Sequence, residues 1–202
     1  MRLSARLLPL VGVIFALAMA AVLLLTYGTQ AARDPDLVVT NELCIVAPAT
    51  PYDSSSGQAM RAPKPIPADA RCPVCGMYPA RTPRWAAQTV FRDGASHFFD
   101  SPIDLFVFLQ RMDRYNKRYV QEDLAVSYVT DFETGQWIEA QRAFFVQGST
   151  AMGPMRDADL PAFSTRKSAD VFSRGRGGKV LAFKQVTPEL IQSMNRNTHH
   201  RH

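Results

Sequence analysis

The sulfur of this sequence is concentrated in the segment "RCPVCGMYP", residues 71–79. Cys72 and Cys75 are three residues apart, and Met77 follows the second cysteine after one glycine. Thiolate and thioether ligands are soft and select Cu(I) over hard cations. Gly76 lets the backbone turn so that Cys75 and Met77 can point to one centre. The segment is therefore a candidate soft-metal loop.

Other uses of a Cys-x-x-Cys pair fit this sequence less well. Haem attachment needs a histidine where Gly76 stands. A structural zinc site needs two more ligands, but the only other cysteine is Cys44 and the domain has no closely spaced histidine pair. A redox pair usually opens a helix, which Gly76 and Pro79 oppose. A disulfide between Cys72 and Cys75 stays open, because an oxidising compartment would favour it.

Two further segments offer candidate ligands. In "STAMGPM", residues 149–155, Met152 and Met155 flank Gly153-Pro154 rather than following a helical spacing. Met152 is a candidate ligand, with gap filling in the core as its alternative. His97 is the only histidine inside the domain and is a reserve ligand, although a strand histidine beside phenylalanines is more often packed or solvated.

Two series of expected elements surround these residues. The first has strands over 85–91 and 96–100 joined by an Asp-Gly turn, a helix from 101 to 117 and a strand over 123–131. The second has strands over 142–148 and 160–164, a helix over 165–175 and a strand over 179–184. A last helix is expected over 187–194, with Thr187 as its cap. The pattern predicts an α+β fold of two ββαβ repeats that form one compact domain.

An internal duplication would explain one regularity of the sequence. Phe99 and Phe108 are nine residues apart, as are Phe163 and Phe172, and each pair links the end of a strand to a helix. Coincidence in a phenylalanine-rich chain is the alternative.

The N-terminal part is expected to attach the domain to a membrane. Residues 7–25 are nineteen residues without charge, preceded by two arginines, and this length can span a bilayer. Residues 1–29 are thus a signal-anchor, or a cleaved signal peptide as the alternative. Residues 30–70 are rich in proline and serine and predict an extended linker. The domain, residues 71–195, would then lie in the periplasm or another extracytoplasmic space, followed by a histidine-containing tail over 196–202.

The net charge of +5 does not indicate a nucleic-acid partner. Basic residues form no run interleaved with aromatic ones, so the charge is attributed to solubility and membrane orientation. We therefore expect no nucleic-acid role.

The segments "RCPVCGMYPARTPRWAAQTVFRDGASHFFDSPIDLFVFL", "YVTD", "AFFVQGSTAMGPM" and "VTPELIQSM" resemble, in this order, the nitrous oxide reductase accessory protein NosL family. The resemblance covers about residues 71–195. It implies a fold of two ββαβ repeats and an extracytoplasmic Cu(I)-binding protein that is not an enzyme. The implied partner is a copper apo-enzyme, and the resemblance indicates nitrous oxide reductase as this partner.

The resemblance also assigns ligands. Cys75 and Met77 match the Cys-Gly-Met element of the family, Cys72 matches the first cysteine of the motif, and Met152 matches the Met-Gly-Pro element. Typical members are lipoproteins, whereas this sequence has a long apolar segment where the modified cysteine would be.

Two other functions compete with a membrane-tethered Cu(I) chaperone. A thiol-disulfide oxidoreductase would use Cys72 and Cys75 to keep the copper-ligand cysteines of a partner reduced. A purely structural domain would keep the two cysteines bonded and dock a partner. Met77 discriminates between them, since copper binding has a use for a thioether and disulfide exchange has none.

Overall fold

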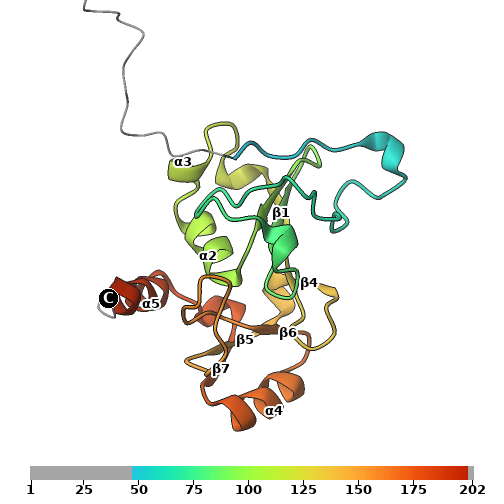
Figure 1. The fold of residues 1–202 in the computed structure, drawn as a ribbon. Helices are drawn as coiled ribbons and strands as arrows, with labels where there is room; N and C mark the ends of the chain where they lie inside the picture. The colour runs from blue at the N-terminus through green and yellow to red at the C-terminus, as the bar shows by residue number, and fades with distance from the viewer. Residues whose placement is uncertain (1–46, 200–202) are drawn as a thin grey trace, which may run out of the picture. The chain divides into compact units, whose positions relative to one another are not determined.

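Two antiparallel β-sheets organise residues 47–199, the part of the chain that the computed structural model describes (Figure 1). The first sheet has the order β2-β1-β3-β4, and the second has the order β6-β5-β7. The strands are β1 Ala87–Phe91, β2 Ser96–Phe99, β3 Leu124–Thr130, β4 Trp137–Glu139, β5 Phe144–Gln147, β6 Ala162–Phe163 and β7 Lys179–Ala182.

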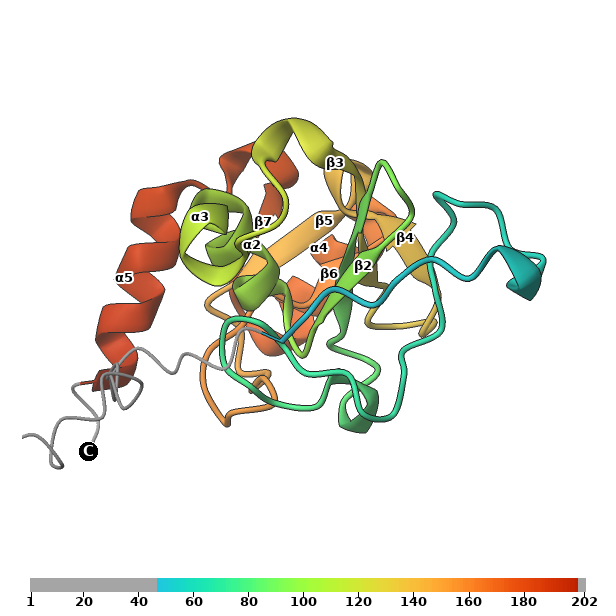
Figure 2. The ribbon, with the colours of Figure 1, turned by 90° about the horizontal axis from the view of Figure 1, so that it is seen from above.

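Within the described residues the sheets are accompanied by the α-helices α2 Pro102–Gln110, α3 Met112–Tyr115, α4 Arg166–Arg176 and α5 Pro188–His199. Short 3-10 helices are η1 Ser54–Ser56, η2 Pro79–Arg81, η3 Gln121–Asp123, η4 Ala140–Arg142 and η5 Phe183–Gln185. Helix α5 packs beside α2, as Figures 1 and 2 both show, and buries Ile191 and Met194. The long helix predicted over residues 101–117 is divided into α2 and α3, because Arg111 between them leaves the helical backbone conformation with φ −139° and ψ 46°.

Both main helices begin where the sequence predicts, and each has a hydroxyl side chain as its cap. The backbone N–H of Asp104 donates to Ser101 Oγ at 3.4 Å at the start of α2. At the start of α4, the N–H of Ser168 donates to Thr165 Oγ1 at 3.0 Å. Such caps satisfy N–H groups that have no partner inside the helix.

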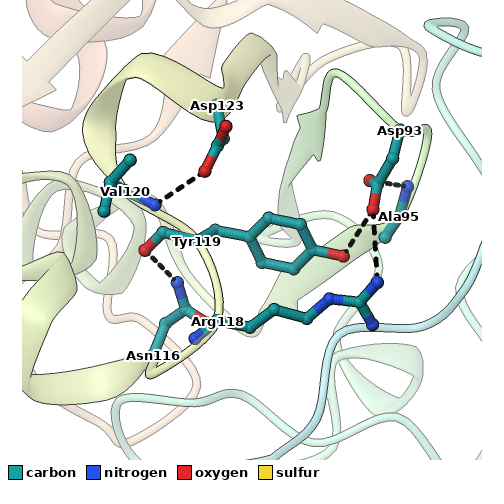
Figure 3. Close-up of polar contacts among 7 residues, drawn as sticks. All are labelled: Asp93, Ala95, Asn116, Arg118, Tyr119, Val120 and Asp123. Carbon is teal, nitrogen blue, oxygen red and sulfur yellow. Dashed lines mark hydrogen bonds and ion pairs between the residues drawn. The ribbon is translucent and has the colours of Figure 1, made fainter.

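The predicted hairpin between β1 and β2 is present, and its turn is tied to the segment after α3 (Figure 3). Asp93 Oδ1 accepts from the N–H of Ala95 at 3.0 Å, and Oδ2 accepts from the hydroxyl of Tyr119 at 2.8 Å. The Tyr119 ring stacks on Phe91 with 3.9 Å between ring centroids. These contacts fix the chain that leads from the helical layer into β3.

One hydrophobic core joins the two sheets. Its buried members include Phe99 and Phe108 of the first series and Phe145 and Leu181 of the second. The rings that are nine residues apart meet in both series, with centroids 5.1 Å apart for Phe99 and Phe108 and 4.9 Å apart for Phe163 and Phe172. The predicted α+β composition is confirmed, while internal duplication stays a prediction.

Residues 47–70 require a correction to the predicted linker. Thr50 forms a two-way backbone bridge with Ser96 on β2, with both N–O distances 2.8 Å. Farther along, the side chain of Gln88 on β1 exchanges two hydrogen bonds with the backbone of Lys64. The segment is irregular, as its proline content predicts, but it packs on the first sheet instead of extending away from it. The edge strand β2 gains a backbone partner at Ser96 in this way.

The predicted membrane anchor, residues 7–25, lies outside the described residues and stays a prediction. Within residues 47–199, no helix combines the length and the apolar character that a membrane crossing requires.

Candidate metal site

The loop that carries the two cysteines is closed by its own backbone. The N–H of Cys72 donates to the carbonyl of Met77 at 2.8 Å, and the N–H of Gly76 donates to the carbonyl of Cys72 at 2.9 Å. Gly76 has φ +76°, in the left-handed region that glycine adopts without steric cost. The turn between the two cysteines therefore brings their thiols to one place.

Two carboxylates face these thiols. The Cys75 thiol donates to Asp100 Oδ1 at 3.0 Å, and the Cys72 thiol donates to Asp104 Oδ2 at 3.3 Å. One potential ligand atom from each of the four residues lies within 4.8 Å of all the others. Within residues 47–199 this is the only such group of His, Cys, Asp and Glu side chains. We call it the thiol–carboxylate cluster.

The start of α2 positions the two carboxylates. Asp100 follows β2 directly, Ser101 caps the helix, and Asp104 lies in the first turn. Residues four apart face the same side around a helical turn. The N-terminus of a helix also stabilises negative charge, so it suits carboxylates and thiolates.

The cluster is largely hidden from solvent. Cys72 is completely buried and Asp100 is 1% exposed, whereas Cys75 and Asp104 are partly exposed. Asp100 Oδ2 is buried and has no hydrogen-bond partner among residues 47–199. A buried carboxylate oxygen without a partner is costly in free energy. A cation bound at the cluster would relieve this cost, so the residues present fit a metal ion.

Burial also keeps protons on the cluster. It raises the pKa of the Cys72 thiol. The pKa of Cys75 is raised first by its hydrogen bond with Cys72 and then by burial. Burial, and next the neighbouring charge of Asp100, raise the pKa of Asp104 to about 8. A metal that binds thiolates must displace these protons, so its affinity will depend on pH.

The four side chains together provide two sulfur and two oxygen ligands. The sulfur pair suits Cu(I), which prefers soft ligands. A set of Cys and Asp side chains can also hold Zn²⁺ in tetrahedral coordination. Both thiols are free in the structure, so they are available as ligands.

The two predicted thioether ligands lie at the surface. Met77 is 42% exposed and Met152 is 50% exposed, so filling of the core does not explain either residue. Met152 belongs to a turned loop in which it pairs with Ala158. Met155 is 60% exposed. Roles of Met77 and Met152 as ligands stay predictions.

His97 lies in a different environment from the thiols. It is 2% exposed and contacts the rings of Phe91 and Phe108, with centroids 5.6 Å and 5.2 Å away. Burial lowers its pKa to about 4, so its imidazole is neutral at physiological pH. The structure does not place His97 in the thiol–carboxylate cluster. Its packing with aromatic rings matches the alternative that the sequence left open.

Sequence reasoning missed Asp100 and Asp104. They are 25 and 32 residues from their cysteine partners, so no local motif connects them. The available signal was a pair of acids four residues apart, on either side of the predicted start of a helix at residue 101. Two acids at such a position are a candidate ligand pair once a cysteine loop is present.

A small α+β domain with antiparallel sheets and a buried thiol–carboxylate cluster defines a candidate metal-binding protein. A model of the NosL family matches residues 63–191, more than half of the chain, and the chain belongs to this family. The predicted resemblance is thus confirmed.

Two curated relatives carry the name copper-binding lipoprotein NosL. The protein from Stutzerimonas stutzeri is 31% identical over 123 residues, which are 60% of this chain and 64% of that protein. The protein from Achromobacter cycloclastes is 39% identical over 57 residues, which are 28% of this chain and 30% of that protein. The matched region is therefore less than two thirds of the length of either relative.

A solved structure has a similar fold. The crystal structure of the copper chaperone NosL from Shewanella denitrificans superposes with a TM-score of 0.53 at 26% identity, and the match covers 64% of this chain and 98% of that chain. The mixed α/β architecture with antiparallel sheets is thus a property of this family.

Proposed function

We propose that this chain is a Cu(I)-binding metallochaperone that carries copper to an apo-enzyme. The thiol–carboxylate cluster is the observation that carries this proposal, because it is a buried group with sulfur ligands and an unpartnered carboxylate oxygen. The names of the relatives, copper-binding lipoprotein and copper chaperone, agree with it. In this function copper is cargo, and the chain catalyses no reaction.

The contacts of the thiols suggest how copper is taken up. Each thiol donates its proton toward a carboxylate before metal arrives. When Cu(I) binds, the sulfur atoms become thiolates, and their protons pass to the carboxyl groups or to solvent. The two thiolates offset the single positive charge of the ion, and a carboxyl group that has taken up a proton stays neutral beside them. Met77 and Met152, being exposed, are suited to complete the sulfur coordination from the solvent side and to be replaced by ligands of a partner.

Nitrous oxide reductase is the client that we propose, on the basis of the family relationship. We place the domain outside the cytoplasm, attached to the membrane through residues 7–25. The relatives are named lipoproteins, which also implies membrane attachment for them. If residues 7–25 form an anchor, the mature protein keeps Met1 and stays in the membrane fraction at high salt. A mature N-terminus near Ala32 would support cleavage instead.

A thiol-disulfide oxidoreductase gains little support from the cysteine environment. Reactive cysteines in such enzymes have lowered pKa values, because the thiolate is the nucleophile. Here the pKa values of Cys72 and Cys75 are both raised, and Cys72 is inaccessible to a partner disulfide. The pair is better suited to a metal that displaces protons than to disulfide exchange.

Competition titration tests the proposed function. The purified full-length protein is kept reduced without oxygen and titrated with Cu(I) against a chelator, and separately with Zn²⁺. We expect Cu(I) to bind far more tightly than Zn²⁺, because the sulfur ligands are soft. Equal affinities for the two ions would contradict the chaperone function and favour a structural zinc site.

A further inference from the structure

A buried carboxyl group, Asp159, connects the loop that carries Met152 with the start of α2. Its side chain is 7% exposed, and Oδ1 accepts from the N–H of Ile103 at 3.3 Å and from the N–H of Leu160 at 2.7 Å. Ile103 lies in the first turn of α2, one residue before Asp104. A residue from the segment between β5 and β6 thus contacts the helix end that carries the carboxylates of the cluster.

Asp159 also packs against the backbone beside Met152. A Cβ atom placed on Gly153 would lie 2.5 Å from Asp159 Oδ2 and 2.8 Å from Asp159 Cβ. Only glycine allows this approach. Met152 bridges to Ala158, and the N–H of Gly153 donates to the carbonyl of Asp157 at 2.7 Å. The turn that carries Met152 and the carboxyl of Asp159 therefore form one unit, which we call the Met152 turn, residues 152–159.

The Met152 turn needs such a fixed point. The side chain of Met152 is 50% exposed, so packing in the core does not hold it. Arg156 in the same turn has φ 60°, a conformation that costs free energy for a residue other than glycine. Strained backbone persists where its surroundings hold it in place.

We infer that Asp159 is a positioning residue of the proposed copper site, which holds the Met152 turn on the first turn of α2 and so fixes the Met152 thioether for copper binding. The inference rests on the proposed function. Asp159 is not part of the thiol–carboxylate cluster and acts through the backbone of Ile103 and the turn. A ligand that is held in place before the metal arrives loses less conformational entropy on binding.

A double-mutant cycle on the full-length protein tests this inference. Cu(I) affinity is measured by chelator competition for wild type, Asp159→Ala, Met152→Ala and the double variant, with circular dichroism to confirm folding. In the wild-type background we expect Met152→Ala to lower the affinity by about 10-fold or more. In the Asp159→Ala background we expect Met152→Ala to change the Cu(I) affinity by less than about 2-fold, because the thioether is no longer held in place.

Two further variants separate positioning from general stability. Asp159→Asn keeps an oxygen acceptor for Ile103 and Leu160, so it should retain the full effect of Met152→Ala. Gly153→Ala introduces a Cβ against Asp159 and should weaken Cu(I) binding as Asp159→Ala does, even if Asp159→Ala fails to fold. Its matched control is Gly175→Ala in α4, where a Cβ meets no atom within 4 Å. X-ray absorption at the copper edge should show one sulfur fewer in Gly153→Ala than in Gly175→Ala.

The outcomes distinguish this inference from the proposed function. If the wild-type protein binds no Cu(I), the proposed function fails first. If the wild type binds Cu(I), two results overturn the inference while the proposed function stands. In the first, Met152→Ala does not change the Cu(I) affinity. In the second, Met152→Ala lowers the Cu(I) affinity by the same factor with and without the Asp159 carboxyl. Unchanged copper coordination in folded Gly153→Ala would also overturn it.

Discussion

The two sheets begin their helices in the same way but with different chemistry. After β2 the chain continues with Asp100, the cap Ser101 and, three residues later, Asp104. After β6 the corresponding positions are Ser164, the cap Thr165 and Ser168. Both helices start with a hydroxyl cap two residues after a strand, whereas the acids at the first and fifth positions after the strand are present only beside the cysteine loop. The proposed copper site is therefore a property of side chains placed on one of two similar helix starts.

The helices also differ in how they contact the core. Helix α2 buries five residues, namely Pro102, Ile103, Leu105, Phe106 and Phe108, whereas α4 buries only Ala169 among its residues. The last turn of α4 carries Arg174 and Arg176, which favour the C-terminal end of a helix. The helix whose start carries the candidate carboxylates is thus the more deeply buried of the two, which suits a preorganised site.

The largest expected effect tests this difference in packing. Phe108→Ala removes a completely buried ring from the core and should lower the free energy of unfolding by about 3–5 kcal/mol. Phe172→Ala is the matched change in α4, where the ring is only partly buried, and should cost less than half as much. Urea unfolding of both variants measures the difference. Equal losses would show that α2 is no better anchored than α4.

A smaller effect concerns the acids at the start of α2. Asp104→Asn removes the carboxyl group that accepts from the Cys72 thiol and can take up its proton, and we expect the Cu(I) affinity to fall about 10-fold. Asp170→Asn removes a carboxylate from α4 that pairs with Arg166, and it should leave the affinity unchanged. Chelator competition on both variants provides the comparison. Equal behaviour of the two would mean that the carboxylates of the cluster do not act on the metal.

The smallest effect is the pH dependence of the metal-free protein. The pKa of Asp104 rises from 3.8 to about 8 and that of Asp159 from 3.8 to about 7, both first through burial. The folded state therefore holds protons that the unfolded state releases, and stability falls as pH rises through this range. His97 has the opposite effect, but only between about pH 4 and its ordinary pKa of 6.5.

Between pH 6.5 and 8 the effect of Asp104 and Asp159 on stability can be measured without the opposing effect of His97. There we expect the free energy of unfolding to fall by about 1 kcal/mol or more as pH rises. Asp104→Asn should flatten this dependence, while Asp113→Asn on the exposed face of α3 should not. Stability that rises with pH in this window would contradict the assigned environments.

Local signals predicted much of the fold. The hairpin turn at Asp93-Gly94 and the caps Ser101 and Thr165 act over a few residues, so the sequence displays them directly. Strand β4 was not predicted, because its three residues are too short to show a period. The packing of residues 47–70 on the first sheet depends on partners far along the chain, such as Gln88, which bonds to Lys64.

The candidate site also has one part that local sequence predicts and another that depends on residues far along the chain. The turn from Cys72 to Met77 is local, and it brings the two thiols together as its sequence predicts, while their use as ligands of a soft metal stays a prediction. Asp100 and Asp104 join it only through tertiary folding. His97 was predicted as a reserve ligand from its residue type, with packing beside phenylalanines as the alternative, and the contacts of its ring with Phe91 and Phe108 agree with that alternative.

The central claim is that the two thiols of the cysteine loop hold copper beside the start of α2, and X-ray absorption at the copper edge tests it most directly. Cu(I)-loaded wild type and Cys75→Ser are compared, with circular dichroism to confirm that both are folded. We predict a coordination shell dominated by sulfur in the wild type and one sulfur fewer in Cys75→Ser. The Cu(I) affinity of Cys75→Ser should be lower than that of the wild type by about 100-fold or more. A shell of nitrogen and oxygen alone, unchanged in folded Cys75→Ser, would contradict the claim.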